Sequence, residues 1–351
     1  MRDVAVVGFA QAANVRRTTG TAFGVEMLLP VFHDALGQAG MTSDDVGFWC
    51  SGSSDYMAGR AFSFVMAVDA IGAFPPVAES HVEMDAAWAL YEAWVKIQTG
   101  ECETALAYGF GKSSAGQLRR VMSLQLDPYV VAPLWPDSVS LAALQARAGI
   151  DAGKWSEAAM AEVAVRSRAA AKDNPDAQIT GDFTLEELLA QPYLAEPLRL
   201  HDCPPISDGA AAVVLAADDG ARQACERPAW IHGFEHRVDP QNLGVRDLTT
   251  AASAAASAAE AGVDGVELAE IHAPFTHQEL ILRQALDLPQ EVTVNPSGGP
   301  LCANAMFVAG LTRIGEVARR IHRGEAESGV AHATSGPCLQ QNLVCVMRGR
   351  S

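Results

Sequence analysis

The stretch that decides the fold is GECETALAYG at residues 100–109, which has a second copy, GEAESGVAHA, at residues 324–333. Each copy follows a long segment of helical character, turns at a glycine, and then becomes apolar. This is the order in which a helical crossover returns to a buried strand in an α/β protein. The chain therefore contains one structural unit twice.

Further elements recur in the same order around the two copies. Each half has an opening apolar strand, a helix that stops at Ala-Gly, a second strand, another helix and a closing strand. The first half has them near residues 4–8, 34–40, 46–50, 61–71 and 210–216, and the second half near residues 229–234, 255–262, 268–272, 278–286 and 342–347. Alternating strands and helices imply parallel strand pairing. We therefore predict a duplicated α/β fold with α-β-α-β-α layers, divided into residues 1–227 and 228–351.

The first half is the longer one because it carries an insertion at about residues 112–199. The insertion includes a helical stretch near residues 155–172. Long ordered insertions often lie over a functional site. We predict a helical loop domain that covers part of the site.

The composition excludes several classes of function. The formal net charge is −17, with 42 acidic and 25 basic residues, and there is no basic stripe of the kind that binds nucleic acid. The seven cysteines are scattered without metal-site spacing, which favours reduced thiols in a cytoplasmic protein. No apolar segment reaches the roughly 18 residues of a membrane span, and the apolar N-terminus is typical of a strand rather than a signal peptide. We expect a cytoplasmic protein without a metal, a nucleic-acid partner or a membrane span.

Three segments, in the right order along the chain, resemble landmarks of the thiolase superfamily. Residues 270–280, EIHAPFTHQEL, resemble the His-Asp-Cys-Phe segment of sterol-carrier-protein thiolases. Residues 294–299, VNPSGG, resemble the segment that precedes the Gly-His-Pro motif, and residues 207–212, SDGAAA, resemble a strand entry of the same proteins. The chain is thus similar to the sterol-carrier-protein-thiolase-like members, and the resemblance implies the thiolase fold.

Two further segments resemble the actinobacterial lipid-transfer-protein type, a steroid side-chain aldolase-like group. They are HATSGPCLQQNLVCV at residues 332–346 and GFWCSGSSDY at residues 47–56. The resemblance implies an acyl-CoA substrate, with no cofactor besides the CoA that belongs to the substrate. It also implies a homodimer or a heteromer with another thiolase-like chain, and a possible partner built from a zinc ribbon and an OB-fold.

The chain departs from the thiolase pattern at the nucleophile. Thiolases place a cysteine at the N-terminus of a buried helix, where the helix dipole favours the thiolate. The matching stretch is ESHVEMDAAWAL at residues 79–90, and it puts Glu83 at the nucleophile position within about a residue. The histidine of the Gly-His-Pro motif aligns with Asn304 or Ala305. Acyl transfer through a cysteine is therefore not expected.

Four residues are the candidate catalytic groups. His272 follows a predicted strand, where it could stabilise an enolate, although a structural histidine would fit the same place. His332 could be a general base or a histidine bonded to backbone. Glu83 and Asp85 stand at the predicted start of a buried helix, where burial would raise a carboxyl pKa. We favour Glu83 as a base and Asp85 as a helix cap.

A second group of residues could form the substrate site, each with a simpler structural alternative. Asn304, Ser297 and Gly336 could be wall or oxyanion groups. Tyr108 and Tyr56 could supply a phenolic acid, but packing at a strand end is favoured for both. Cys338 and Cys302 could be nucleophiles, and packing is again favoured. Lys112 could meet a CoA phosphate.

The sequence thus predicts retro-aldol cleavage of a β-hydroxyacyl-CoA, with a sterol side chain or another bulky apolar acyl group, and without a cysteine nucleophile. One alternative is a 3-ketoacyl-CoA thiolase or acyltransferase that uses Cys338 or a displaced cysteine. Another is a non-catalytic acyl-CoA-binding subunit of a heteromeric thiolase-like aldolase complex. Lipid transfer ranks lowest, because no amphipathic membrane-binding helix or polybasic surface is visible.

Overall fold

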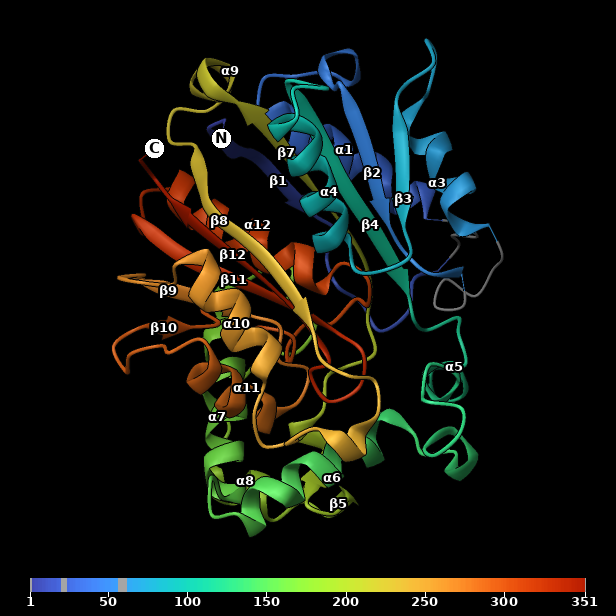
Figure 1. Ribbon diagram of the computed structural model, residues 1–351, viewed down its shortest axis with the longest axis vertical. Coiled ribbons are helices and arrows are strands. Elements are labelled where there is room, and N and C mark those ends of the chain that lie inside the picture. Colours follow the sequence, from blue (N-terminus) through green and yellow to red (C-terminus); the bar gives the residue numbers. More distant parts are fainter. Residues whose placement is uncertain (1, 20–23, 56–61, 351) are drawn as a thin grey trace.

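The computed structural model describes residues 2–19, 24–55 and 62–350, and within them ten strands form one mixed sheet (Figure 1). The strand order is β10-β9-β11-β12-β8-β1-β7-β4-β2-β3. The first half contributes β1 (Val4–Gln11), β2 (Phe48–Gly52), β3 (Glu79–Val82), β4 (Thr104–Lys112) and β7 (Asp208–Ala217). The second half contributes β8 (Ala229–Val238), β9 (Leu268–Ile271), β10 (Thr293–Val294), β11 (Ser328–Ser335) and β12 (Gln341–Arg348).

The two halves repeat one strand order. Read from the two edges inward, they run β3-β2-β4-β7-β1 and β10-β9-β11-β12-β8. The outer three strands of each half are parallel, the inner pairs are antiparallel, and β1 joins β8 where Ala5 faces Trp230. The predicted duplicated α/β fold is confirmed. The division between residues 227 and 228, which falls between α9 (Asp218–Ala224) and β8, stays a prediction.

Helices form the remaining layers. The inner layer is α4 (Ala86–Gln98) and α12 (Ala309–His322), and its side chains share the main apolar core with strand residues of both halves. On the outer faces, α1 (Val25–Gln38) and α3 (Ser63–Ile71) cover the first half, and α10 (Ala252–Ala261) and α11 (Thr276–Ala285) cover the second. Short 3-10 turns lie at Ser43–Asp45, Ala132–Leu134, Ala171–Asp173, Leu200–Asp202 and Leu243–Val245. These are the predicted α-β-α-β-α layers.

The start of α4 lies unusually close to the sheet. A Cβ added at Gly52 would lie 2.4 Å from the Cα of Ala86, so only glycine permits this approach. The helix begins at Ala86, later than the sequence suggested, because residues 79–82 pair with β2 as an edge strand. Glu83 therefore lies in the turn before α4, and not in the helix.

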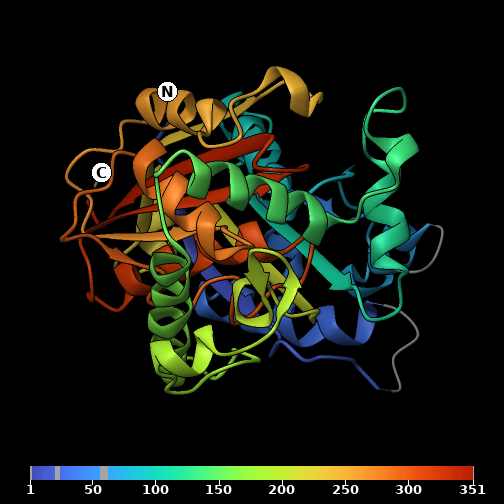
Figure 2. The same cartoon turned by 90° about the horizontal axis from the view of Figure 1, so that it is seen from below.

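The insertion is a helical layer below the sheet (Figures 1 and 2). It contains α5 (Leu118–Leu124), α6 (Ser138–Asp151), α7 (Glu157–Ala170), α8 (Leu185–Leu189) and the strand pair β5 (Tyr193–Ala195) and β6 (Leu198–Arg199). The amide oxygen of Gln145 on α6 lies 3.1 Å from His277 Nε2 and accepts a hydrogen bond from Gln278 at 3.0 Å. Arg166 on α7 forms an ion pair with the buried Glu279. These bonds fix the predicted helical insertion to α11.

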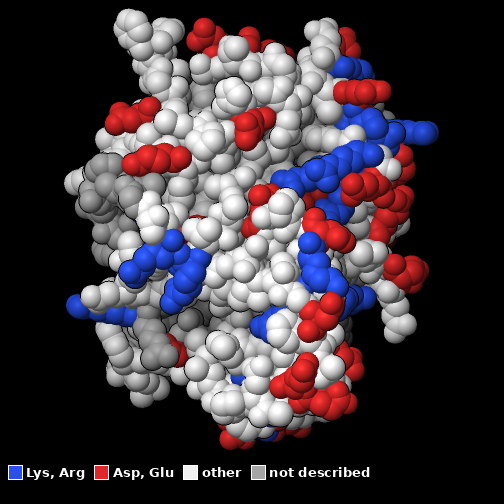
Figure 3. Space-filling view, turned by 180° about the vertical axis from the view of Figure 1, so that it is seen from behind, with Lys and Arg blue, Asp and Glu red and all other residues white. Residues whose placement is uncertain are grey.

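The surface carries both signs of charge. On the face shown in Figure 3, lysines and arginines are interspersed with acidic side chains. The described residues on this face form no continuous basic stripe. Among the described residues, none of the helices combines the length and the apolar character needed to cross a membrane.

Candidate active site

A cavity of about 1010 Å³ lies where the carboxyl ends of the two sets of parallel strands meet the insertion. Loops at this edge of an open α/β sheet commonly hold ligands. The first half contributes Ser54, Glu83 and Asp85, and the second half contributes His272 and Asn304. Much of the remaining wall is apolar and comes from α5, α6 and neighbouring loops, namely Leu118, Val121, Met122, Leu124, Val139, Leu141, Ala142, Leu194, Leu200, Ile206 and Phe275. The cavity wall is therefore largely apolar, and we call the part around the five polar side chains at the carboxyl ends of the strands the polar end.

His272 and Asn304 form a pair at the polar end. The backbone N–H of Thr334 donates to His272 Nδ1 at 3.4 Å, so Nδ1 is unprotonated and Nε2 carries the hydrogen. That Nε2 lies 3.3 Å from Asn304 Oδ1 and donates to it. The amide nitrogen of Asn304, on the other branch of the same side chain, is then the hydrogen-bond donor that this pair can offer to a ligand.

The His272 ring is neutral at physiological pH. Burial lowers its pKa to about 3, and the nearby His332 and the Arg313 guanidinium act in the same direction. A neutral imidazole with Nδ1 already accepting is a donor and not a base. The pair can therefore stabilise negative charge on an oxygen. The enolate-stabilising role of His272 stays a prediction, and no sequence signal coupled this residue to Asn304.

His332 lies behind the cavity wall. Its ring is fully buried in β11, and Nε2 is 2.9 Å from Asn342 Oδ1. Burial lowers its pKa to about 4. It is absent from the cavity lining among the described residues. Among the described residues His332 therefore has no surface in the cavity, and its role as a base stays a prediction that the proposed reaction does not need.

Glu83 is the accessible carboxylate of the cavity. It follows the edge strand β3 and is exposed, which contradicts the burial expected from the sequence. The hydroxyl of Ser54, a residue that the sequence did not single out, donates to its Oε1 at 3.4 Å. A carboxylate that faces a ligand-sized cavity with one weak donor can still accept a proton.

Asp85 caps two helices at once. Its Oδ1 accepts from Ala87 N at 2.9 Å and from Leu311 N at 3.0 Å, and its Oδ2 accepts from Gly310 N at 2.9 Å. Burial raises its pKa, whereas these three N–H groups and Arg313 act in the opposite direction. The side chain joins the N-termini of α4 and α12, which fits the cap interpretation.

We expect Asp85→Ala to lower the free energy of unfolding by about 2–3 kcal/mol, because it leaves buried N–H groups of two helices without acceptors. Chemical denaturation at neutral pH measures this loss. Ser156→Ala is the matched control, since Ser156 caps only α7 through Ala159 N and should cost about 1 kcal/mol. A folded Asp85→Ala of unchanged stability with lost activity would instead make Asp85 a proton carrier.

The thiols near the cavity are poor nucleophiles. Cys203 and Cys338 line it, but their Sγ atoms donate to the carbonyls of Arg199 at 3.6 Å and Leu141 at 3.7 Å. Burial raises the pKa of Cys203 to about 12 and that of Cys338 to about 11. Cys302 is outside the lining, and burial raises its pKa to about 12. All seven cysteines lie in the described part of the chain, and all are free.

The remaining predicted residues are divided between the cavity and its surroundings. Gly336 lines the cavity with a φ of 74°, a conformation that suits glycine. Ser297, Tyr108 and Lys112 are buried and do not belong to the lining found among the described residues. Tyr108 packs against Phe32 and Trp49, as its structural alternative predicted. Tyr56 lies outside the described residues.

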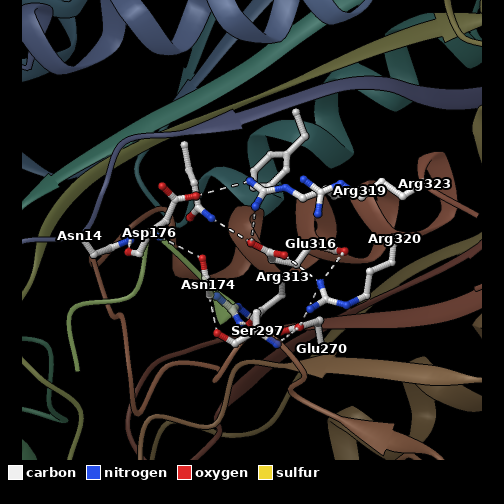
Figure 4. Close-up of polar contacts among 12 residues, drawn as sticks. Asn14, Asn174, Asp176, Glu270, Ser297, Arg313, Glu316, Arg319, Arg320 and Arg323 are labelled. Atoms are coloured by element: carbon white, nitrogen blue, oxygen red, sulfur yellow. Dashed lines mark hydrogen bonds and ion pairs between the residues drawn. The ribbon is translucent and has the colours of Figure 1, made fainter. Parts of the chain in front are cut away.

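The sequence also missed a polar network beneath the polar end. Glu270, Ser297 and Arg313 are all buried and joined by short hydrogen bonds (Figure 4). The NPSGG motif placed Ser297 near the site, but no sequence signal linked it to Arg313. Within residues 2–19, 24–55 and 62–350, there is no group of three His, Cys, Asp or Glu side chains that could hold a metal ion.

The chain is similar in sequence to several acyl-CoA enzymes, whereas no family model matches it. It is 28% identical to an acetyl-CoA acetyltransferase of Methanothermobacter thermautotrophicus, over 50% of this chain and 55% of that protein. It is 25% identical to sterol carrier protein 2 of Gallus gallus, over 73% of this chain and 54% of that protein. It is 26% identical to the 17-hydroxy-3-oxo-4-pregnene-20-carboxyl-CoA lyase of Mycobacterium tuberculosis, over 48% and 50%. The chain thus spans about half the length of these curated relatives.

Solved structures show the same fold over the whole chain. An Ltp2-ChsH2(DUF35) aldolase superposes with a TM-score of 0.82 and 18% identity, covering 99% of this chain and 98% of that one. Human mitochondrial 3-ketoacyl-CoA thiolase superposes with a TM-score of 0.79 and 16% identity, covering 100% and 99%.

The fold and the cavity define a thiolase-fold protein in which the carboxylates of Glu83 and Asp85 directly precede the buried helix α4. More specifically, its sequence is similar to thiolase-superfamily proteins, among them sterol carrier protein 2.

Proposed function

We propose that this chain cleaves a β-hydroxyacyl-CoA by a retro-aldol reaction and forms no acyl-cysteine. The observation that carries the proposal is the composition of the cavity. It offers a carboxylate, Glu83, and a neutral donor pair, His272 and Asn304, while its two thiols have raised pKa values. Proton transfer and oxyanion stabilisation are the two needs of a retro-aldol step.

The reaction begins at the β-hydroxyl group. Glu83 accepts its proton, the oxygen becomes the carbonyl of an aldehyde or ketone, and the bond between Cα and Cβ breaks. The electron pair of that bond forms a thioester enolate, whose oxygen accepts from the Asn304 amide. The proton on Glu83, or one from water, then reaches Cα and gives a shortened acyl-CoA. The electrons balance without an oxidant or a covalent nucleophile.

The substrate that fits is bulky and apolar. A volume of about 1010 Å³ with an apolar wall from α5 and α6 leaves room for a fused-ring acyl group beside the thioester. The steroid name of the lyase from M. tuberculosis supports a sterol side-chain acyl-CoA. We extend the same proposal to other large apolar acyl groups of similar shape.

We further propose that the chain works in an oligomer. One structural neighbour is named as a complex of Ltp2 with ChsH2(DUF35), and a relative from Thauera aromatica is named benzoylsuccinyl-CoA thiolase subunit BbsB. These names support a homodimer or a heteromer with another thiolase-like chain, and an accessory partner of the zinc-ribbon and OB-fold type.

The test is turnover by the purified chain, alone and with its partner. We expect a β-hydroxyacyl-CoA to yield one carbonyl product and one shortened acyl-CoA. Cys203→Ala, Cys302→Ala and Cys338→Ala should each keep kcat within about threefold, because no step uses a thiol. Mass spectrometry of a quenched reaction should show no acyl-protein adduct.

Two outcomes would favour the rivals. Cleavage of a 3-ketoacyl-CoA that requires free CoA, with an acyl group trapped on a cysteine, would make the chain a thiolase. Tight binding of acyl-CoA without turnover, even with every partner present, would make it a non-catalytic subunit.

A further inference from the structure

The loop that carries Asn304 is tied to the strand that carries His272. Residues 295–304 follow β10, and Asn295 Oδ1 accepts from Ile271 N at 2.7 Å. Ser297 then donates to Glu270 twice, from its backbone N at 2.9 Å and from its Oγ at 2.8 Å. Because Glu270 and Ile271 directly precede His272, these bonds set the position of the loop relative to the imidazole.

Arg313 completes this tie from the inner helix α12. Its Nη1 donates to Glu270 Oε2 and to Ser297 Oγ, both at 2.6 Å (Figure 4). Arg313 and Ser297 are each 2% exposed, and Glu270 is fully buried. Replacing a buried ion pair by well-packed apolar side chains of similar volume often leaves the free energy of unfolding unchanged or raises it. The buried charges therefore need an explanation other than stability alone.

The same network continues away from the site. Arg320 contacts Glu316 at 2.9 Å, and Arg319 contacts Glu316 at 3.3 Å and Asp176 at 3.6 Å (Figure 4). The Arg319–Asp176 pair joins α12 to the insertion, whereas the two pairs with Glu316 lie within α12. Arg320 also lies 3.9 Å from Glu270, so among the described residues Arg319 is the outer residue that contacts neither Glu270 nor Ser297. It provides a control of similar chemistry at a greater distance from the donor pair.

We propose that Ser297, Glu270 and Arg313 are positioning residues that hold the Asn304 amide against the His272 imidazole at the thioester end of the cavity. This inference rests on the proposed function and goes beyond it. An oxyanion donor must lie within about 2.7–3.1 Å of the developing charge. A displacement of about 1 Å can cost up to about a hundredfold in rate. A loop held at one end by three hydrogen bonds can meet that requirement.

The first test is Ser297→Ala. The variant loses the hydroxyl bonds but keeps the Ser297 backbone bond and the Glu270–Arg313 pair, so the fold should persist. We expect kcat to fall about tenfold with KM nearly unchanged, because the loss concerns the transition state. Arg319→Gln, which breaks an outer pair of the same network, should leave kcat within about twofold.

A double-mutant cycle separates positioning from general disturbance. If Ser297 acts through Asn304, adding Ser297→Ala to Asn304→Ala should cause no further loss of kcat. If Ser297 acts on the fold in general, the two losses should multiply. Multiplied losses, or an unaffected kcat in the single Ser297→Ala variant, would overturn the proposal.

A spectroscopic test does not depend on turnover. In the wild-type chain, ¹⁵N NMR should find His272 as one neutral tautomer with its hydrogen on Nε2. In folded Ser297→Ala, the Nε2–H resonance should shift or broaden as Asn304 moves, and in Arg319→Gln it should not. An unchanged His272 spectrum would overturn the positioning role. If the His272 spectrum changes in Ser297→Ala but the chain cleaves no hydroxyacyl-CoA, the positioning role stands. Only the proposed reaction is then rejected.

Discussion

Glu83→Gln should lower kcat for β-hydroxyacyl-CoA cleavage by about 10²–10⁴-fold, the range expected when a general base is lost. The glutamine keeps the size of the side chain and can still accept the hydrogen bond from Ser54, which lies 3.4 Å from Oε1. It cannot take the β-hydroxyl proton. KM should change little, since the base acts in the transition state. Product formation at saturating substrate measures the effect.

The matched control is Glu79→Gln. Glu79 lies on the edge strand β3 that directly precedes Glu83 and accepts from Ser51 Oγ at 3.4 Å, but it does not line the cavity among the described residues. Its substitution should leave kcat within about twofold. An equal loss of kcat in Glu83→Gln and Glu79→Gln would show that both substitutions act by disturbing the structure around β3. Full activity in Glu83→Gln would remove Glu83 as the base and leave the retro-aldol proposal without its proton acceptor.

The fold could be predicted because its signal is spread along the whole chain. The repeated glycine turns, such as those at Gly100 and Gly324, and the apolar segments after them mark the crossovers of an α/β fold. The boundary before α4 could not be found in this way. The resemblance to thiolases places Glu83 at the nucleophile position at the start of a helix, whereas the pairing of residues 79–82 with β2 decides that a strand comes first.

The site was predictable only where a motif marks the end of a strand. His272 follows β9, and Asn304 follows the NPSGG loop, so both were named as candidates. The role of Ser297 depends on Arg313, which comes from a different element, and sequence spacing does not encode such a contact. The position of His332 could not be predicted for a related reason. Its ring is fully buried within β11 and lies 2.9 Å from Asn342 Oδ1, a contact with a second strand that the motif does not encode.

Three buried histidines with strongly lowered pKa values contribute to the pH dependence of stability, and burial also lowers the pKa of His201 and His322. Burial lowers the pKa of His272 and His277 to about 3 and that of His332 to about 4. In the unfolded chain each has the ordinary value of about 6.5. The folded state then binds fewer protons than the unfolded state below that value. The stability contributed by the neutral rings is therefore present above about pH 6.5 and is lost as the pH falls toward about 4.

We expect the free energy of unfolding to drop by about 4 kcal/mol between about pH 7.5 and pH 5.5, because each of the three rings contributes about 1.4 kcal/mol. Buried carboxyls with raised pKa values, such as Asp85, oppose this loss mainly at lower pH. Urea denaturation at the two pH values measures the drop.

A single substitution tests whether these rings are the cause. His277 bonds to Gln145 across the insertion, and in His277→Gln the drop between the two pH values should shrink to about 3 kcal/mol, even though the variant is less stable at both. His33 is exposed, and His33→Gln should leave the drop unchanged. A wild-type chain equally stable at both pH values would mean that these rings gain protons in the folded state. In that case the His272 ring would be protonated below about pH 6.5, and the neutral donor pair would be lost at about pH 5.5.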